Sequence, residues 1–154
     1  IDKGAIVPST IGKELALYVV YYSPMQMAAD LPKHYSKHMD AFQFIKNVPV
    51  DWSERKILNS EFREYVSMAR KDKSSENWYV GGITNENERD LKIDFSFLES
   101  GKEYTMKMYL DTQNTHWKEN PMEYQITERE VSSNDNIDIY LAPGGGFAIE
   151  IIAK

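Results

Sequence analysis

The sequence predicts a mainly β protein, in which a helical segment precedes an antiparallel β-sandwich. From Arg55 onward, apolar and polar side chains alternate in many short segments, as they do from Leu91 to Phe97. Such alternation is typical of strands with one buried and one wet face. Turn residues separate the segments, and no helical stretch between them is long enough for a parallel crossover. We therefore expect an antiparallel sandwich with Leu91, Ile93, Phe95 and Phe97 pointing inward.

Eight segments in this half have the length and pattern of strands. They are Lys56–Asn59, Glu64–Arg70, Trp78–Thr84, Asp90–Phe97, Glu103–Leu110, Tyr124–Val131, Ile137–Leu141 and Phe147–Ile152.

The first 54 residues have a helical pattern. Thr10 can cap a first helix, since its hydroxyl can accept a bond from a free N–H of the first turn, and Ser23-Pro24 ends that helix. The apolar face of this helix is Ile11, Leu15, Tyr18, Val19 and Tyr22. A second helix is expected after Pro32, with Tyr35, Met39, Phe42 and Ile45 on its apolar side. Between the helices, the pattern of Met25–Ala29 fits a short buried strand or a helical turn equally well.

Composition narrows the possible functions. The chain has 154 residues, 42% of them hydrophobic and 27% charged, which is the profile of a globular domain or a domain with an extension. Its net charge of −6 argues against partners that are nucleic acids or anionic membranes. Without cysteine, disulfides, thiolate zinc sites and cysteine nucleophiles are excluded. The chain starts at Ile1, and we expect that its natural N-terminus lies further upstream.

Few residues form a recognisable chemical motif. His34 and His38 are four apart on the expected helix, but no third metal ligand accompanies them, so a solvated helix face is expected. Asp111, Asn114 and Glu119 offer oxygen ligands in one loop, yet the spacing of a calcium loop is missing. Gly144–Gly146 lacks the Lys-Ser/Thr of a phosphate loop, and a tight turn is expected there.

Aromatic side chains are the remaining candidates for binding. Trp52, Trp78, Tyr79 and Trp117 could stack on the apolar faces of sugar rings. We expect Trp78 to pack inside the sandwich, because it begins a strand. Trp117 lies in the polar stretch from Asn114 to Asn120 and is the candidate for exposure and sugar binding.

Four stretches together resemble a known family. They are residues 15–32, 40–52, 78–84 and 141–149, which include Tyr21-Tyr-Ser-Pro24 and Leu141-Ala-Pro-Gly144. In this order they resemble the C-terminal part of glycoside hydrolase family 97, which contains α-glucosidases and α-galactosidases of polysaccharide-degrading bacteria. The resemblance covers nearly the whole chain.

The resemblance implies a domain organisation. The family has an N-terminal β-sandwich, a (β/α)8 barrel and a C-terminal sandwich. Residues 1–54 would then be the end of the catalytic barrel and residues 55–154 the C-terminal sandwich, with Met25–Ala29 as the last barrel strand. Asp30 would follow that strand at the active-site side of the barrel, where it could touch substrate or cap the following turn.

The resemblance also implies what lies elsewhere. The family's acid, its base or nucleophile and its calcium-binding glutamates lie upstream, so no catalytic residue and no metal ligand is expected in this chain. The parent enzyme would use calcium and cleave α-linked oligosaccharides, and its barrel and N-terminal sandwich would be the partners of this chain. A bacterial, periplasmic or exported location is implied. The alternative is a non-catalytic carbohydrate-binding module that uses exposed aromatic residues.

Overall fold

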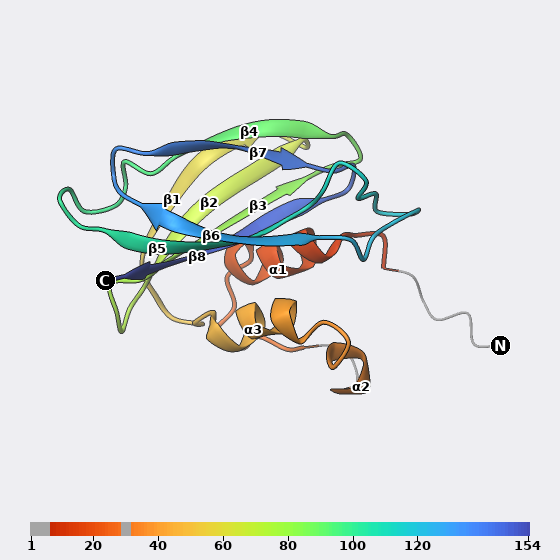
Figure 1. Cartoon of the computed structure of the whole chain (residues 1–154), viewed down its shortest axis with the longest axis horizontal. Coiled ribbons are helices and arrows are strands. Elements are labelled where there is room, and N and C mark those ends of the chain that lie inside the picture. The colour runs from red at the N-terminus through yellow and green to blue at the C-terminus, as the bar shows by residue number, and fades with distance from the viewer. Residues whose placement is uncertain (1–6, 29–31) are drawn as a thin grey trace.

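Three layers make up the structure. A computed structural model describes residues 7–28 and 32–154. Helices cover one face of a six-stranded sheet, and a two-stranded sheet covers the other face (Figure 1). Every strand pairing is antiparallel, so the predicted mainly β fold is confirmed. None of the helices within the described ranges combines the length and apolarity needed to cross a membrane.

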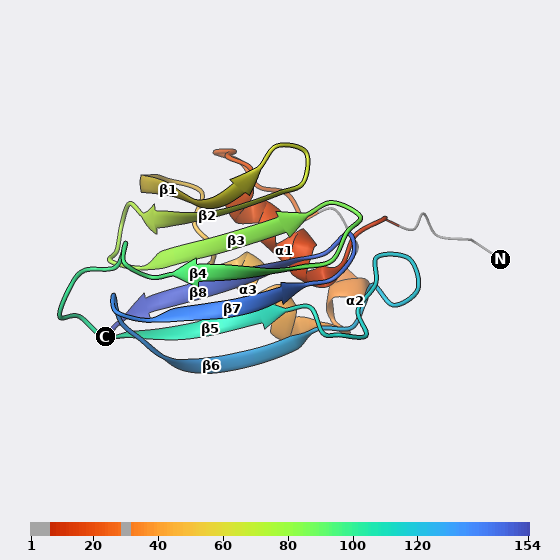
Figure 2. The same ribbon diagram turned by 90° about the horizontal axis from the view of Figure 1, so that it is seen from above.

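All eight predicted strands are present, with ends shifted by a few residues. They are β1 (Trp52–Glu61), β2 (Tyr65–Asp72), β3 (Trp78–Thr84), β4 (Arg89–Asp94), β5 (Tyr104–Leu110), β6 (Gln125–Val131), β7 (Asn136–Leu141) and β8 (Gly146–Ala153). The large sheet has the order β1-β2-β3-β8-β5-β6, and β4 and β7 lie over it as a pair (Figure 2).

The main core lies between the two sheets. Leu91, Ile93 and Phe95 are buried in it, as predicted, and Phe97 is half-buried at its rim, where it packs on Trp78. Strand β4 ends at Asp94, and the chain turns where the Leu98 N–H donates to the Phe95 carbonyl. Leu98 therefore takes the next buried position in place of Phe97.

A second core lies between the large sheet and the helices. Helix α1 (Ile11–Val20) begins at Thr10, whose hydroxyl accepts from the Lys13 N–H at 3.2 Å, so the predicted cap is confirmed. Leu15 and Val19 of this helix are buried in the second core. Tyr22 was predicted on the apolar face but is exposed, because the helix ends two residues earlier.

Glycine allows α1 to lie directly on the sheet. A Cβ at Gly81 of β3 would come within 2.8 Å of the Ala16 carbonyl oxygen of α1. A Cβ at Gly12 would collide with the backbone of Gly146 in β8. Both glycines thus sit at close backbone approaches. Helix and sheet form one packed unit rather than two bodies joined by a linker.

The predicted second helix is interrupted. It consists of α2 (Pro32–Tyr35) and α3 (Met39–Asn47), with a turn at residues 36–38. The prediction of its apolar side is confirmed only in part. Ile45 packs on the second core, and Tyr35 and Phe42 are half-buried against each other. Met39 is exposed, and Ala41 and Phe44 are the buried residues of α3. Phe44 contacts two tyrosine rings of the sheet, those of Tyr79 and Tyr109, edge to face.

The expected strand at Met25–Ala29 is not seen in its described part. Residues 25–28 have no strand conformation, and Ala29 lies outside the described residues. A strand needs a paired neighbour for its backbone N–H and C=O groups. Met25 and Met27 are exposed, and no strand of the described chain pairs with this segment.

Candidate functional site

The Asp111 side chain links the ends of three strands, β5, β7 and β8. It follows β5 directly and is 2% exposed. Its Oδ2 accepts from the N–H groups of Ala142 at 3.1 Å and Gly146 at 2.8 Å. These bonds hold the turn between β7 and β8, so the predicted tight turn at Gly144–Gly146 is confirmed. Burial raises the pKa of Asp111 to about 6, against the opposing effect of these bonds and of nearby Lys13.

The glycine turn is shaped around this carboxylate. A Cβ at Gly145 would overlap Asp111 Oδ2. The other oxygen, Oδ1, has no hydrogen-bond partner among the described residues. Asp111 is thus a buried acceptor for backbone donors, and its chemistry here is structural.

Glu150 has a similar role on the helix side of β8. Its Oε1 accepts from the Tyr109 hydroxyl and its Oε2 from the Asn47 amide, both at 3.1 Å. The Tyr79 hydroxyl donates to the Asn47 carbonyl at 3.1 Å. Burial raises the pKa of Glu150, and the two hydrogen bonds oppose that rise. The last residue of α3 is therefore tied to the sheet through a buried carboxyl group.

Arg70 holds the other end of α1. Its Nε donates to the Val19 carbonyl at 2.6 Å and its Nη2 to the Val20 carbonyl at 3.4 Å. The guanidinium lies 5.8 Å from the ring centre of Tyr22 and 5.9 Å from that of Trp52. A cation at a helix C-terminus satisfies free carbonyls and complements the helix dipole. The sequence analysis missed this residue, although an arginine directly after the apolar Ala69 in a predicted strand is a usable signal.

The structure describes one of the two predicted substrate-binding residues. Asp30 lies outside the described residues. Trp117 is half-buried, and its side chain lies against Gly144. Its backbone N–H donates to the Pro143 carbonyl at 3.3 Å. Its ring stacks on that of His116 with centroids 5.9 Å apart. Trp78 is buried between the sheets, as predicted.

The possible metal ligands do not converge. Asp111 faces the β7–β8 turn, whereas the Asn114 amide donates to Glu123. His38 Nδ1 lies 3.3 Å from the Tyr124 hydroxyl, and the side chain of His34 is outside what the structure describes. Over residues 7–28 and 32–154, no group of three or more His, Cys, Asp or Glu residues is placed to hold an ion.

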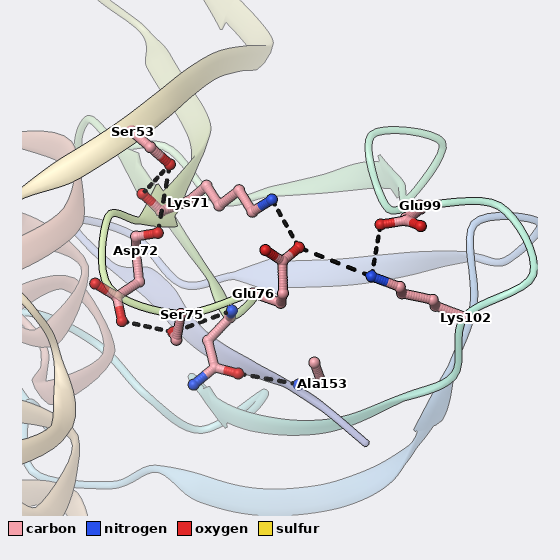
Figure 3. Close-up of polar contacts among 9 residues, drawn as sticks. Ser53, Lys71, Asp72, Ser75, Glu76, Glu99, Lys102 and Ala153 are labelled. Atoms are coloured by element: carbon pink, nitrogen blue, oxygen red, sulfur yellow. Dashed lines mark hydrogen bonds and ion pairs between the residues drawn. The ribbon is translucent and has the colours of Figure 1, made fainter.

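A polar network closes the end of the sandwich near the C-terminus. Lys71 pairs with Glu76 at 2.8 Å, and Lys102 joins Glu76 to Glu99 (Figure 3). It connects the β2–β3 turn to the β4–β5 loop. Exposed pairs of this kind contribute only about 0–1 kcal/mol each, so the network fixes loops and does not suggest a binding site.

Exposed apolar side chains gather at the C-terminal end of α1. We call Tyr21, Tyr22, Met25 and Met27 the α1-end surface; all four are exposed. The segment folds back on the helix, since the Tyr18 hydroxyl donates to the Met27 carbonyl at 3.1 Å. Clustered exposed apolar residues mark contacts with another protein part.

A second exposed surface lies at the β1–β2 turn. Phe62 is 83% exposed, and Arg63 has a left-handed φ of 65°. Asn85 supports the turn from behind, because its N–H donates to the Glu64 carbonyl and its amide to the Arg63 carbonyl. An open hollow of about 540 Å³ adjoins the turn, with Val66 and Ile83 among its lining residues. We call Glu61, Phe62, Arg63, Val66 and Ile83 the hairpin surface.

Known proteins resemble this chain throughout. A retaining α-galactosidase of Bacteroides thetaiotaomicron is 36% identical over 139 residues, which are 90% of this chain and 20% of that enzyme. A glycoside hydrolase family 97 enzyme from Pseudoalteromonas sp. strain K8, solved with panose and with acarbose, is 41% identical with a TM-score of 0.93. That match covers 96% of this chain and 23% of the enzyme. A β-arabinopyranosidase, 23% identical with a TM-score of 0.78, shares the fold.

The chain therefore spans about a fifth of the length of these relatives. Residues 51–152 match the family described as glycosyl-hydrolase 97 C-terminal, oligomerisation. This match covers most of the chain, and the galactosidase and the Pseudoalteromonas enzyme extend the similarity to the helices before it. The chain belongs to the C-terminal domain family of glycoside hydrolase family 97.

Proposed function

We propose that this chain is the C-terminal part of an α-glycosidase and supports the catalytic barrel of that enzyme. The observation that carries the proposal is the position of the helices. Their inner side shares a core with the sheet, while the α1-end surface exposes four large apolar side chains. A barrel that continues from these helices would cover that surface. Residues 1–54 would be the end of the barrel and residues 55–154 the supporting sandwich.

In this proposal the chemistry lies upstream. The parent would cleave α-glucosidic or α-galactosidic bonds with two carboxyl groups. Within the part of the chain that the structure describes, the two buried carboxyl groups are those of Asp111 and Glu150, and they hold the turn and the helix. Asp30 would contribute at most to the rim of the substrate site. Calcium, the cofactor that the family resemblance implies, would bind upstream. A periplasmic or exported bacterial location fits such a role.

Sugar contact by Trp117 is a second candidate function. The indole is half-exposed and stacked with His116 in a polar loop, which is a possible platform for a sugar ring. The packing against Gly144 gives the same residue a structural role. This candidate would make the domain an accessory binding module.

The test uses the parent enzyme and the isolated chain side by side. Release of nitrophenol from nitrophenyl α-glucoside and α-galactoside is measured with calcium present. The enzyme should turn over one of them, and the chain alone neither. The double variant Tyr22→Glu/Met27→Glu should lower the melting temperature of the enzyme, whereas the control Met122→Glu on an exposed loop should not. Turnover by the chain alone that disappears in Asp30→Asn, or an unchanged melting temperature of the double variant, would contradict the proposal.

A further inference from the structure

We propose that Arg55 and Arg70 together bind a carboxylate group from the upstream part of the same polypeptide. The proposal rests on the proposed function and deepens it, because that function places the upstream barrel beside the helices. It adds the chemistry of the contact, which is an acidic side chain opposite a pair of arginines on the helix side of β1 and β2. We call Tyr22, Trp52, Arg55, Ile57 and Arg70 the arginine surface.

The two arginines are direct cross-strand partners. Arg55 of β1 pairs with Arg70 of β2 in the register of the sheet. Arg70 points to the helix side, where it bonds the end of α1, and residues directly opposite one another lie on the same face. Like charges in such a pair destabilise it. An anion bound between the two guanidinium groups would turn this repulsion into attraction.

The described residues do not supply this anion. The ion pairs within residues 7–28 and 32–154 use lysines and Arg89, and neither Arg55 nor Arg70 takes part in one. Arg70 is nevertheless only 6% exposed. Burial, together with the nearby charge of Arg55, lowers the pKa of Arg70 from its ordinary value. A buried charge without an opposite charge is costly, so a carboxylate at this place would be stabilising.

Arg70 also has donors left after it holds helix α1. Its Nε and Nη2 donate to the Val19 and Val20 carbonyls, whereas Nη1 donates to no atom of the described chain. Nη1 is not among the enclosed polar atoms that lack a partner, so it faces the surface. The rings of Tyr22 and Trp52 lie beside the guanidinium and fix its orientation. A fixed guanidinium with outward N–H groups suits a carboxylate, which can accept two of them at once.

Apolar side chains beside the pair indicate a protein segment rather than a free anion. Ile57 is 67% exposed, and Tyr22 is exposed as well. Helix α1 packs closely on β3 at Gly81, and β1 lies beyond β2 at the outer edge of the sheet (Figure 2). Tyr22 also belongs to the α1-end surface, so the two surfaces are continuous. One upstream segment with an acidic side chain among apolar ones would complement both in charge and in polarity.

The first test maps arginine labelling in the parent enzyme. Phenylglyoxal modifies accessible arginine side chains, and mass spectrometry of the digested enzyme reports each site. Arg55 should be labelled about tenfold more slowly than Arg129, which is also exposed in this domain, because labelling of Arg55 requires the contact to open. Both should react alike after unfolding in urea.

Two labelling results would overturn the proposal. In the first, Arg55 and Arg129 of the folded enzyme react at the same rate. In the second, Arg55 is protected only until the enzyme is diluted to single copies, since a second copy would then be the cover.

A charge reversal gives opposite signs with and without the carboxylate. Without it, Arg55→Glu relieves the repulsion from Arg70 and should raise the melting temperature of the parent enzyme or leave it unchanged. With it, the same variant places two carboxylates together, and the melting temperature should fall by about 2–4 °C. The control Lys56→Glu makes the same change of charge on the next residue of β1, which is exposed and points to the other face. An increase, or a decrease no larger than that of the control, would contradict the proposal.

Failure of this inference can be told from failure of the proposed function. Hydrolysis of nitrophenyl glycosides and the melting temperature of Tyr22→Glu/Met27→Glu test the proposed function. If both behave as expected while Arg55 is labelled freely, the barrel covers the α1-end surface but brings no carboxylate to the arginines. If the enzyme hydrolyses neither glycoside, the proposed function fails, and the labelling of Arg55 still decides whether an upstream carboxylate binds there.

Discussion

Replacing Phe44 by alanine should destabilise the whole domain. Phe44 lies in α3 but is fully buried, with its ring 5.3 Å from that of Tyr109 and 6.1 Å from that of Tyr79. Removing a buried phenylalanine costs about 3–5 kcal/mol, which includes the cavity. The two edge-to-face pairs account for part of this, at about 0.5–1.5 kcal/mol each. In a chain of this size the loss should lower the melting temperature on the order of 10 °C.

The assay is urea unfolding followed by Trp fluorescence and by far-ultraviolet circular dichroism. Trp78 belongs to the core between the sheets and not to the core that contains α3, so it contributes a signal from the sandwich. The matched control is Phe42→Ala in the same helix. Phe42 is half-buried and packs on Tyr35 at 4.4 Å, so its loss should cost only about 1 kcal/mol. If Phe44→Ala leaves the fluorescence transition unchanged and melts only helix signal, the helices and sandwich do not share one cooperative core.

Three further predictions concern single residues. Arg70→Met should cost about 1–3 kcal/mol in urea unfolding, because the Val19 and Val20 carbonyls lose their donor, whereas Arg129→Met on the exposed face of β6 should cost less than about 0.5 kcal/mol. For Asp111, the folded pKa is raised to about 6 from the ordinary aspartate pKa of 3.8, so its contribution to stability is present below pH 3.8 and is lost as the pH rises through 6. The unfolding free energy of wild type minus that of Asp111→Asn should thus fall by about 3 kcal/mol between pH 3.5 and 7, and a constant difference would refute this origin of the shift. If Trp117 contacts sugar, malto-oligosaccharides or α-galactosides should quench its fluorescence, and equal quenching in Trp117→Phe would exclude it.

The strands of the sandwich could be predicted, because alternating side chains and turn residues are local features of the sequence. Alternation over Leu91 to Phe95 reports directly which face of β4 is buried. Turn residues fix where strands end to within a few positions. The order β3-β8-β5 depends on pairings between distant segments, and a single sequence does not contain that information in a readable form.

The buried faces of the helices were harder to predict, because they depend on packing against the sheet. In α3 the spacing of Met39 and Phe42 suggested one apolar side, but the tyrosines of the sheet select Phe44. The strand expected at Met25–Ala29 came from the resemblance to a barrel. Strand conformation depends on neighbours, and the described chain supplies none there.

Sequence motifs did not indicate the exposed surfaces or the buried side chains that hold turns and helix ends. Asp111 was considered as a possible ion ligand, but its position directly after a buried strand makes it an acceptor for the β7–β8 turn. Phe62 sits between charged residues and resembles any exposed loop residue in the sequence. Only the left-handed conformation of Arg63 and the adjoining hollow distinguish it.

The shared core leads to a last prediction about the domain boundary. The family match begins at residue 51, yet Tyr79, Tyr109 and Ala148 of the sheet are buried by residues of α1 and α3. Deleting the helices would expose these side chains, and burial of a large apolar side chain stabilises by about 1.5–3 kcal/mol. It would also leave Glu150 and Arg70 without the helix groups that they bond.

A chain cut to residues 51–154 should therefore unfold at lower urea than residues 1–154, or aggregate, although it keeps all eight strands. Total domain stabilities are about 5–15 kcal/mol, so the loss of several buried side chains removes much of the margin. Size-exclusion chromatography and urea unfolding of both chains measure this. As a matched control, a chain that starts at residue 7 should behave as the full chain does. If residues 51–154 unfold at the same urea concentration as residues 1–154, the boundary lies at the end of the helices after all, and α1 and α3 belong to the barrel alone.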